Sequence, residues 1–154
     1  MTNDYYKNLP KKRMGAGAIF LNEKDEILIV KPSYKDFWSM AGGVVVENES
    51  PKDACIREVK EEIGINLKDA SLLCIDYCSN KEGNGDSLQF IFFGGVLTEK
   101  EIKEIKIDGK ELVDYRFVKV EEALSLLSEK LKVRIPRCLE ALKNNAVVYF
   151  ENGK

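Results

Sequence analysis

Histidine is missing from this chain of 154 residues, and cysteine, proline and tryptophan are scarce, at four, four and one residues. The cysteines lack the CxxC spacing of common zinc sites, and no histidine is present to complete such a set, so structural zinc is not expected. No apolar run approaches the roughly 20 residues that a membrane-spanning helix needs, and no N-terminal apolar region resembles a secretion signal. We therefore expect buried free thiols, no membrane partner and a cytoplasmic location.

A strong excess of one charge is also missing, because 24 Lys and Arg stand against 26 Asp and Glu, for a net charge of -2. This balance creates no general basic field, so nucleic acid is not expected as a partner. The 44% of hydrophobic and 32% of charged residues are typical of a globular protein. We predict a single domain over residues 1–154 with its own core, in which residues 1–12 are flexible.

The stretch from Gly43 to Ile65 carries an unusual concentration of glutamate. Glu58, Glu61 and Glu62 recur at intervals of three and four, which places them on one side of an α-helix at about 100° per residue. An apolar arc lies beside them, made of Cys55, Ile56, Val59 and Ile63. Stacked carboxylates repel one another unless a cation lies between them, so one flank of this helix packs and the neighbouring flank faces a cleft.

Capping signals set the ends of this helix. Ser50 is the expected N-cap, Pro51 the first helical residue, and Asp53 lies in a capping-box-like position. Gly64 is expected to end the helix in a left-handed conformation, so the helix is predicted at 51–63. Asn48 precedes it in a loop, where asparagine tolerates a left-handed turn.

The remaining pattern mixes strands with helices. Strands are predicted at 14–21, 26–31, 37–41, 72–79, 88–97 and 112–118, and helices at 120–129 and 135–144. The first two strands form a hairpin, residues 80–86 a mobile loop, and residues 99–111 a loop with a short helical turn. The tail AVVYFENG is compatible with a last edge strand. This order predicts an α/β (α+β) fold with a mixed sheet.

The Glu-rich stretch resembles the Nudix box, the signature of the Nudix hydrolases, with every fixed position filled. These positions are Gly43, Glu49, Arg57-Glu58-Val59, Glu61-Glu62 and Gly64-Ile65. A weaker resemblance extends from about Met14 to Val118. It implies a Nudix-like α/β/α sandwich in which the box forms a loop, a helix and a loop. Ala41 replaces a usual proline and Val46 a frequent glutamate, and neither change touches the REVKEE core.

The resemblance also implies roles for the box residues. Glu61 and Glu62 would be ligands of Mg²⁺ or Mn²⁺, and the backbone carbonyl of Gly43 (or Gly42) would add an oxygen. Glu58 would be either a third ligand or the general base on the attacking water. Hard cations of this kind need only one or two carboxylates plus substrate phosphate oxygens, and they lower the pKa of a bound water.

Arg57 lies one turn before Glu61 and across the loop from Glu49, so we expect it to pair with both carboxylates and fix them in place. Arg57, Glu58 and Glu61 make the predicted catalytic set. Without the complete box, the same acidic helix would be interpreted as a solvated surface helix.

Four residues outside the box are further candidates. Glu111 lies in a region resembling an acidic family pattern, and would be a ligand or base, unless it is a solvent-facing charge. Lys31 matches a place where members often carry a residue that touches phosphate. Arg13 belongs to a basic cluster at 11–13, which is either a substrate contact or a solvated lead-in to a strand. Trp38 is expected to bury its ring rather than to stack on a base.

The resemblance implies that the protein is a metal-dependent pyrophosphohydrolase (pyrophosphatase). It would cleave a phosphoanhydride bond in a nucleoside diphosphate linked to another group, by attack of water at phosphorus. A nucleoside triphosphate, ADP-ribose and a nucleotide sugar all remain open as the small-molecule substrate, and a homodimer is allowed for. The alternative is a non-catalytic Nudix-fold module that binds a nucleotide or has a regulatory role, although such modules usually lose a box carboxylate.

Overall fold

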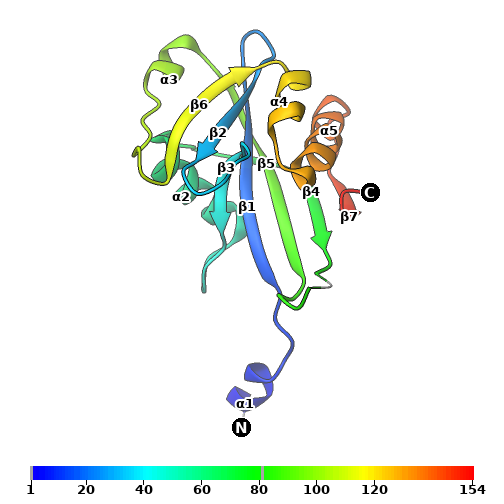
Figure 1. Ribbon diagram of the computed structural model, residues 1–154. Coiled ribbons are helices and arrows are strands. Elements are labelled where there is room, and N and C mark those ends of the chain that lie inside the picture. Colours follow the sequence, from blue (N-terminus) through cyan, green and yellow to red (C-terminus); the bar gives the residue numbers. More distant parts are fainter. Residues whose placement is uncertain (1, 81) are drawn as a thin grey trace.

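The computed structural model describes residues 2–80 and 82–154, and its centre is one mixed seven-stranded sheet (Figure 1). The strand order is β6-β2-β1-β5-β4-β7, and β3 pairs with β1 outside this path. The strands are β1 (Arg13–Asn22), β2 (Ile27–Pro32), β3 (Ala41–Val44), β4 (Ser71–Cys78), β5 (Ser87–Leu97), β6 (Leu112–Val118) and β7 (Val148–Glu151). The pairs β1–β5 and β4–β7 are parallel and the others antiparallel, which confirms the predicted mixed sheet.

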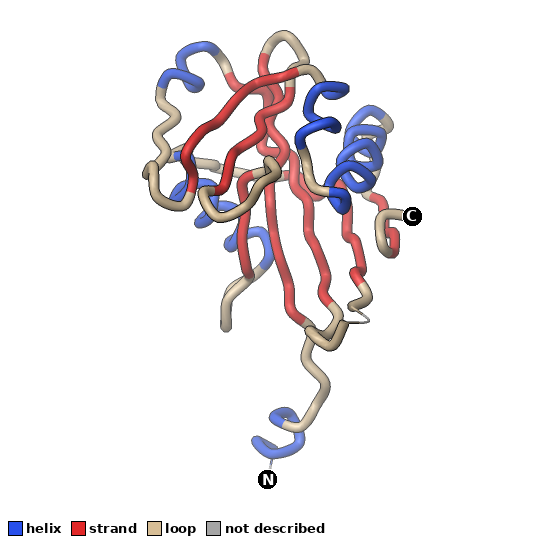
Figure 2. Tube along the Cα trace, in the orientation of Figure 1, coloured by secondary structure: helices blue, strands red, loops and turns tan. Residues whose placement is uncertain are grey.

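Helices cover the two faces of the sheet (Figure 2). The helices are α1 (Thr2–Lys7), α2 (Pro51–Ile63), α3 (Glu99–Lys103), α4 (Val120–Leu126) and α5 (Glu129–Lys143). Of these, α2 packs on one face of the sheet, and α4 and α5 pack on the other. Because side chains alternate along a strand, β1 supplies both faces: Phe20 packs in the core under α2, whereas Ile19 packs in the core under α4 and α5. Phe92 and Phe93 of β5 separate in the same way, as expected for neighbouring strand residues.

The helix α2 follows the capping signals of the sequence. The Ser50 side chain accepts a hydrogen bond from the backbone N–H of Asp53 at 3.0 Å, and Pro51 occupies the first turn. Gly64 ends the helix with φ 74°, and Asn48 has φ 62° in the preceding loop. The predicted span of 51–63 is therefore confirmed, because local chemistry fixes both ends.

Three predicted elements differ from the structure. The helix expected at 120–129 ends at Leu126, and the one expected at 135–144 begins at Glu129, with Ser128 as its N-cap. Pro136 lies exposed inside α5, which continues through it from Glu129 to Lys143. The strand expected at 37–41 is replaced by two isolated bridges, Ser39 with Val30 and Trp38 with Leu127, and β3 begins only at Ala41.

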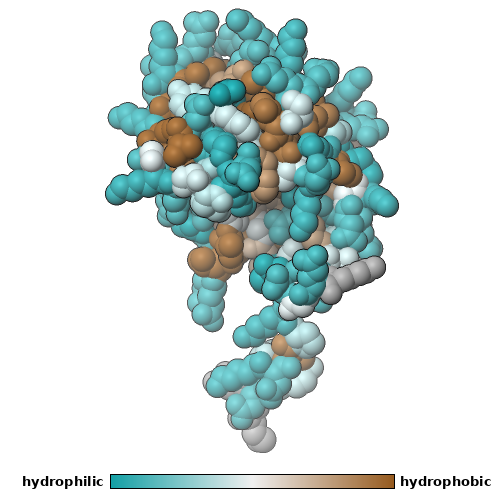
Figure 3. Space-filling model, viewed as in Figure 1, coloured by the Kyte–Doolittle hydropathy of each residue, from teal (hydrophilic) through white to brown (hydrophobic). Residues whose placement is uncertain are grey.

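The N-terminal residues also form a helix where a flexible stretch was expected. Helix α1 projects from the body of the molecule at the start of β1 (Figures 1 and 3). Lys81, in the loop predicted at 80–86, lies outside the described residues. Over the described ranges, no helix combines the length and apolar character needed to cross a bilayer.

Gly94→Ala tests the tight packing between β5 and β1. A Cβ at residue 94 would lie 2.3 Å from the Phe20 ring, and Phe20 is almost fully buried. The overlap should lower the free energy of unfolding by about 1–3 kcal/mol, the usual cost of overpacking. Urea denaturation measures the loss, with Val96→Ala on the exposed side of the same strand as the control. An unchanged midpoint for Gly94→Ala would contradict this packing.

Candidate active site

The acidic flank of α2 lies against the two glycines of β3. A Cβ at residue 43 would fall 2.4 Å from the carboxylate carbon of Glu58, so only glycine leaves room for that carboxylate. The backbone N–H of Gly42 donates to Glu62 Oε2 at 3.0 Å. Two of the three stacked glutamates are therefore held directly against the strand.

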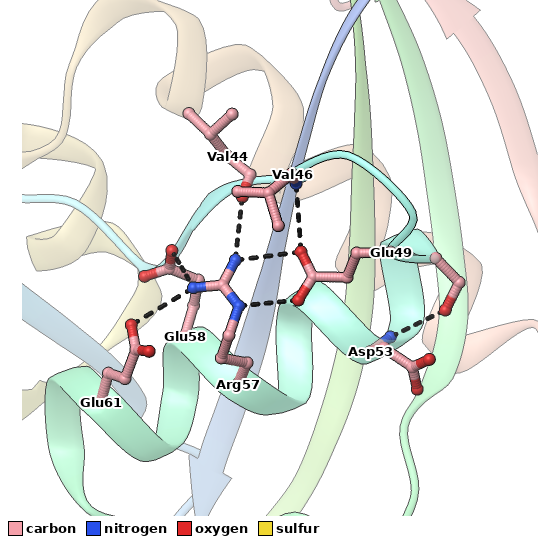
Figure 4. A network of polar contacts seen from close by, with 8 residues as sticks. Val44, Val46, Glu49, Asp53, Arg57, Glu58 and Glu61 are labelled. Atoms are coloured by element: carbon pink, nitrogen blue, oxygen red, sulfur yellow. Dashed lines mark hydrogen bonds and ion pairs between the residues drawn. The ribbon is translucent and has the colours of Figure 1, made fainter.

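Arg57 organises the other carboxylates (Figure 4). Its Nε and Nη2 bind the two oxygens of Glu49 at 2.7 and 3.0 Å, and its Nη1 reaches Glu58 Oε1 at 2.9 Å and Glu61 Oε2 at 3.3 Å. A further bond runs from Nη2 to the carbonyl oxygen of Val44 at 3.1 Å. A guanidinium has five N–H donors, and here each has an acceptor. The predicted pairing of Arg57 with Glu49 and Glu61 is confirmed.

Electrostatics separate the glutamates of the site. The Arg57 guanidinium beside Glu49 lowers the pKa of that carboxyl, with a further contribution from the Val46 N–H. Burial raises the pKa of Glu62 to about 7; the Gly42 N–H opposes this rise, and the charges of Glu58, Glu111 and Asp108 add to it. Glu62 is thus partly protonated near neutral pH, and a cation nearby would favour its charged form.

The donor set suits a hard divalent cation that is shared with a ligand. Within residues 2–80 and 82–154, no three Asp, Glu or Cys side chains are arranged to hold a metal ion by themselves. Glu58 and Glu62 nevertheless place carboxylate oxygens beside Gly42 and Gly43, and Glu61 is exposed on the same flank. Mg²⁺ usually takes one or two carboxylates and completes its shell with water and phosphate oxygens. These residues fit such an ion.

A cavity of about 1030 Å³ opens on the other face of β3. Its floor is formed by residues 13–17 of β1, alternate residues of β5 and the end of β4, and its wall by the junction of α4 and α5. The backbone of Gly42 and Gly43 also lines it. A ligand in this cavity would therefore lie one strand away from the carboxylates of α2.

The candidates outside the box are not all brought together. Arg13 lines the cavity and donates to the Gly85 carbonyl oxygen at 3.2 Å. Glu111 is exposed, and its charge acts on Glu62. The Lys31 ammonium donates to the carbonyl oxygens of Pro32 and Lys35 and does not line the cavity, so its contact with phosphate stays a prediction.

Trp38 is buried, as expected, yet it also belongs to the cavity lining. The guanidinium of Arg116 lies 4.6 Å from the centre of its ring. A tryptophan held in this way is part of the wall rather than a mobile stacking platform.

Three polar residues of the cavity region were missed in the sequence. Gln89 lies in the floor, and Arg134 of α5 forms a buried ion pair with Asp76 of β4 at 2.9 Å. The available signal was a single polar residue inside each of two apolar strands, at Asp76 and Gln89. Asp108 was missed as well, although its charge reaches Glu62.

The architecture is a mixed sheet between helices, with a Glu-rich helix packed against a Gly-Gly strand. Comparison with known proteins identifies the class of protein that has this architecture. The profile of the NUDIX domain matches residues 11–142. The chain therefore belongs to the Nudix hydrolase family, as the box predicted.

Individual relatives match different parts of the chain. The m7GpppN-mRNA hydrolase of Saccharomyces cerevisiae is 42% identical over 65 residues, which are 42% of this chain and 6% of the yeast protein. Nudix hydrolase 8 of Arabidopsis thaliana is 26% identical over 154 aligned residues, covering 92% of this chain and 42% of the plant protein. The chain thus spans less than half the length of either relative.

A solved structure shares the fold. The MutT protein from Methanosarcina mazei Go1 aligns with a TM-score of 0.68 at 23% identity, covering 90% of this chain and 99% of that one. At this identity the likeness extends to the fold alone.

Glu62 should make the stability of the metal-free protein depend on pH. Its pKa is raised to about 7 from an ordinary 4.5, so the folded protein keeps a proton that the unfolded chain has lost. The associated stability is fully present below about pH 4.5 and is lost as the pH rises through about 7. In EDTA, the free energy of unfolding should fall from pH 5 to 8, and less steeply in Glu62→Gln.

Urea denaturation across this pH range measures the difference between wild type and variant. Glu140→Gln, on an exposed position of α5, is the matched control and should follow the wild type. Parallel curves for wild type and Glu62→Gln would show that Glu62 does not titrate in this range.

The Arg57–Glu49 pair should be energetically coupled. A double-mutant cycle with Arg57→Ala and Glu49→Ala isolates the pair from the other contacts of Arg57. Because the contact is bidentate and partly buried, we expect a coupling free energy of about 1–2 kcal/mol. The matched control is the exposed Lys132–Glu129 pair of α5, for which less than about 0.5 kcal/mol is expected. Equal coupling free energies in the two pairs would show that the Arg57–Glu49 contact is no stronger than an ordinary surface ion pair.

Proposed function

We propose that this protein is a metal-dependent pyrophosphohydrolase that cleaves a phosphoanhydride bond in a small nucleotide, with water as the nucleophile. The observation that carries the proposal is the arrangement of Gly42 and Gly43. The α2 carboxylates meet these glycines from one face of the sheet, and the cavity reaches their backbone from the other. Phosphates of a ligand that extends from the cavity past β3 would therefore reach the carboxylates.

The charge of the cavity lining supports an anionic ligand. Its cationic residues are Arg13, Lys35, Lys130, Lys132 and Arg134, and its acidic residues are Asp36 and Glu129. This local excess of positive charge stands out in a chain with a net charge of -2. Positive charge around a concave surface attracts a polyphosphate and holds it.

The carboxylates of Glu58, Glu61 and Glu62 would hold Mg²⁺ or Mn²⁺, with Gly43 contributing a carbonyl oxygen. When bound, such an ion neutralises diphosphate charge and lowers the pKa of a coordinated water. Arg57 keeps Glu49, Glu58 and Glu61 in position, so its role is to orient the acidic groups. Glu58 serves as a further ligand or accepts the proton of the attacking water, and Glu111 is a second candidate for these tasks.

A small nucleotide is preferred to an RNA 5′ end as the substrate. The name of the yeast relative describes an mRNA hydrolase, but the match covers 42% of this chain and 6% of that protein. The net charge of -2 gives this chain no general basic field to hold an RNA strand. Arg13 and Lys130 lie on the cavity itself, where they suit phosphates close to the reacting bond.

The deciding experiment is a screen of the purified protein over nucleoside triphosphates, ADP-ribose, nucleotide sugars and a 5′-triphosphorylated RNA, with the pyrophosphate and monophosphate products separated by chromatography. Each substrate is assayed with Mg²⁺, with Mn²⁺ and with EDTA. We expect turnover of a small nucleotide that requires the metal and stops in EDTA. Turnover of the RNA alone would replace the proposed substrate class, and binding without turnover would indicate a non-catalytic module.

Removing a box carboxylate should abolish most of the activity on the best substrate. Glu61→Gln and Glu62→Gln preserve shape and delete charge, so each should lower kcat by on the order of a hundredfold or more. Thermal unfolding shows whether each variant is folded, and Glu140→Gln controls for the loss of a helix carboxylate. If both box variants keep wild-type kcat, the mechanism is wrong.

A further inference from the structure

The two ends of the cavity differ in chemistry. At one end, Arg13 of β1 is paired with Ser87 of β5, and Ser87 with Cys78 of β4, so charged and polar groups meet there. At the other end, Trp38 forms a bridge with Leu127 at the junction of α4 and α5. The glycines of β3 lie between these ends, because this strand runs antiparallel to β1 and begins on the Trp38 side.

An exposed aromatic ring distinguishes the second end. Within the described residues, the aromatic side chains of the lining are Phe37 and Trp38. Trp38 is buried and has the Arg116 guanidinium over its ring, whereas Phe37 is 38% exposed. The flat faces of a nucleobase stack on aromatic rings. A base is therefore better accommodated at this end than among the charged and polar groups of the other.

This ring belongs to a turn over residues 33–37 that is fixed at both ends. The Ser33 N–H donates to the Glu111 carbonyl oxygen at 2.8 Å, and the Trp38 N–H donates to the Leu126 carbonyl oxygen at 2.9 Å. All five residues of the turn are exposed. The turn thus runs from the loop of Glu111 to the end of α4, along the rim of the cavity.

Lys31 holds the same turn from within. Its ammonium donates to the carbonyl oxygen of Pro32 at 2.9 Å and to that of Lys35. Asp114, directly opposite Lys31 in β6, pairs instead with Arg116 at 3.4 Å. The positive charge of Lys31 is therefore directed to backbone oxygens that shape the turn.

The turn presents one ring to the cavity and another to solvent. The Lys35 ammonium lies 5.4 Å from the centre of the Phe37 ring and 5.4 Å from that of Tyr34. Lys35 and Phe37 line the cavity, whereas Tyr34 is 73% exposed and lies outside the lining. A nucleotide beside Phe37 would therefore meet a cation as well as an aromatic ring.

We propose that the turn over residues 33–37 binds the base of the nucleotide, which stacks on Phe37, and that Lys31 is the positioning residue that holds this ring at the cavity. This inference rests on the proposed function in taking the ligand to be a nucleotide. Phe37 precedes Gly42 by five residues, which span at most about 17 Å of extended chain, so one nucleotide can reach from the ring to the glycines. Base-free sugar phosphates and polyphosphates are then poor ligands.

Equilibrium binding of AMP and of ribose 5-phosphate tests the inference without relying on catalysis. The two ligands share the ribose and the phosphate and differ in the base, and neither contains a phosphoanhydride bond. Isothermal titration calorimetry in Mg²⁺ should show that wild-type protein binds AMP more tightly by about tenfold or more. Stacking of one base on an aromatic side chain is worth on the order of ten- to a hundredfold in affinity.

Phe37→Leu assigns this preference to the ring. The variant should lower the affinity for AMP by about fivefold or more and leave that for ribose 5-phosphate within about twofold of wild type. The matched control is Tyr34→Leu, which removes the other exposed ring of the turn and should leave both affinities unchanged. An AMP affinity that survives Phe37→Leu, or that falls equally in Tyr34→Leu, would overturn the inference.

Lys31→Met separates positioning from contact with phosphate. Loss of the two hydrogen bonds should loosen the turn and lower the affinity for AMP by about threefold or more, with ribose 5-phosphate unaffected. Lys31→Arg keeps the cationic donors and should restore the affinity for AMP. An equal loss for both ligands would show that Lys31 touches phosphate, and this outcome would overturn its positioning role. Melting temperatures identify any variant that fails to fold.

The results separate the inference from the function on which it rests. Base-dependent binding of AMP without hydrolysis of any polyphosphate would support the base site and overturn the proposed reaction. Metal-dependent hydrolysis with equal binding of AMP and ribose 5-phosphate would do the reverse. Absence of AMP binding to the wild-type protein would also overturn the inference.

Discussion

The close approach of α2 to β3 is the constraint on which the site depends. Glu58 occupies the space that a side chain at Gly43 would fill, and Glu62 takes the N–H of Gly42. The Glu58 contact needs a glycine at 43, and Gly42 lies so close to β1 that a Cβ there would fall 2.4 Å from the Ala16 carbonyl oxygen. Because Gly42 and Gly43 have no side chains, the cavity also reaches the backbone of this strand from the opposite face. One Gly-Gly pair thus serves two surfaces at once.

The electrostatic cost of crowding carboxylates on one helix flank is met in two ways. Arg57 shares its five donors among Glu49, Glu58, Glu61 and the Val44 carbonyl oxygen, so three of the acidic groups have a cationic partner. Glu62 has no such partner in the described structure, and its carboxyl responds by holding a proton more tightly. The group that the protein leaves uncompensated is the one that gains most from an added cation.

The features that could be predicted from the sequence are those that depend on neighbouring residues alone. Ser50, Pro51 and Gly64 set the ends of α2 by themselves, and the helical spacing of the glutamates indicated their common flank. The cavity floor was not predictable in this way, because the row from Gly15 through Gln89 to Asp76 exists only once strands distant in sequence are paired. The start of α5 shows the limit of local signals, since the helix begins at Glu129 behind the Ser128 cap and not at the predicted residue 135. Lys31 was placed correctly on its strand, but its side chain turns to nearby loop carbonyls.

The parallel pairing of β1 with β5 bears on how the protein folds. This central pair joins Arg13 to Ser87 and Asn22 to Leu97, so residues 23–86 must form a loop before any of its hydrogen bonds exist. Closing such a loop costs entropy that is recovered only afterwards, and chains built on non-local pairing fold slowly for this reason. Helix α2 lies within the loop and has its own caps, so it can form early. The formation of the acidic helix therefore does not require the β1–β5 pairing to be complete.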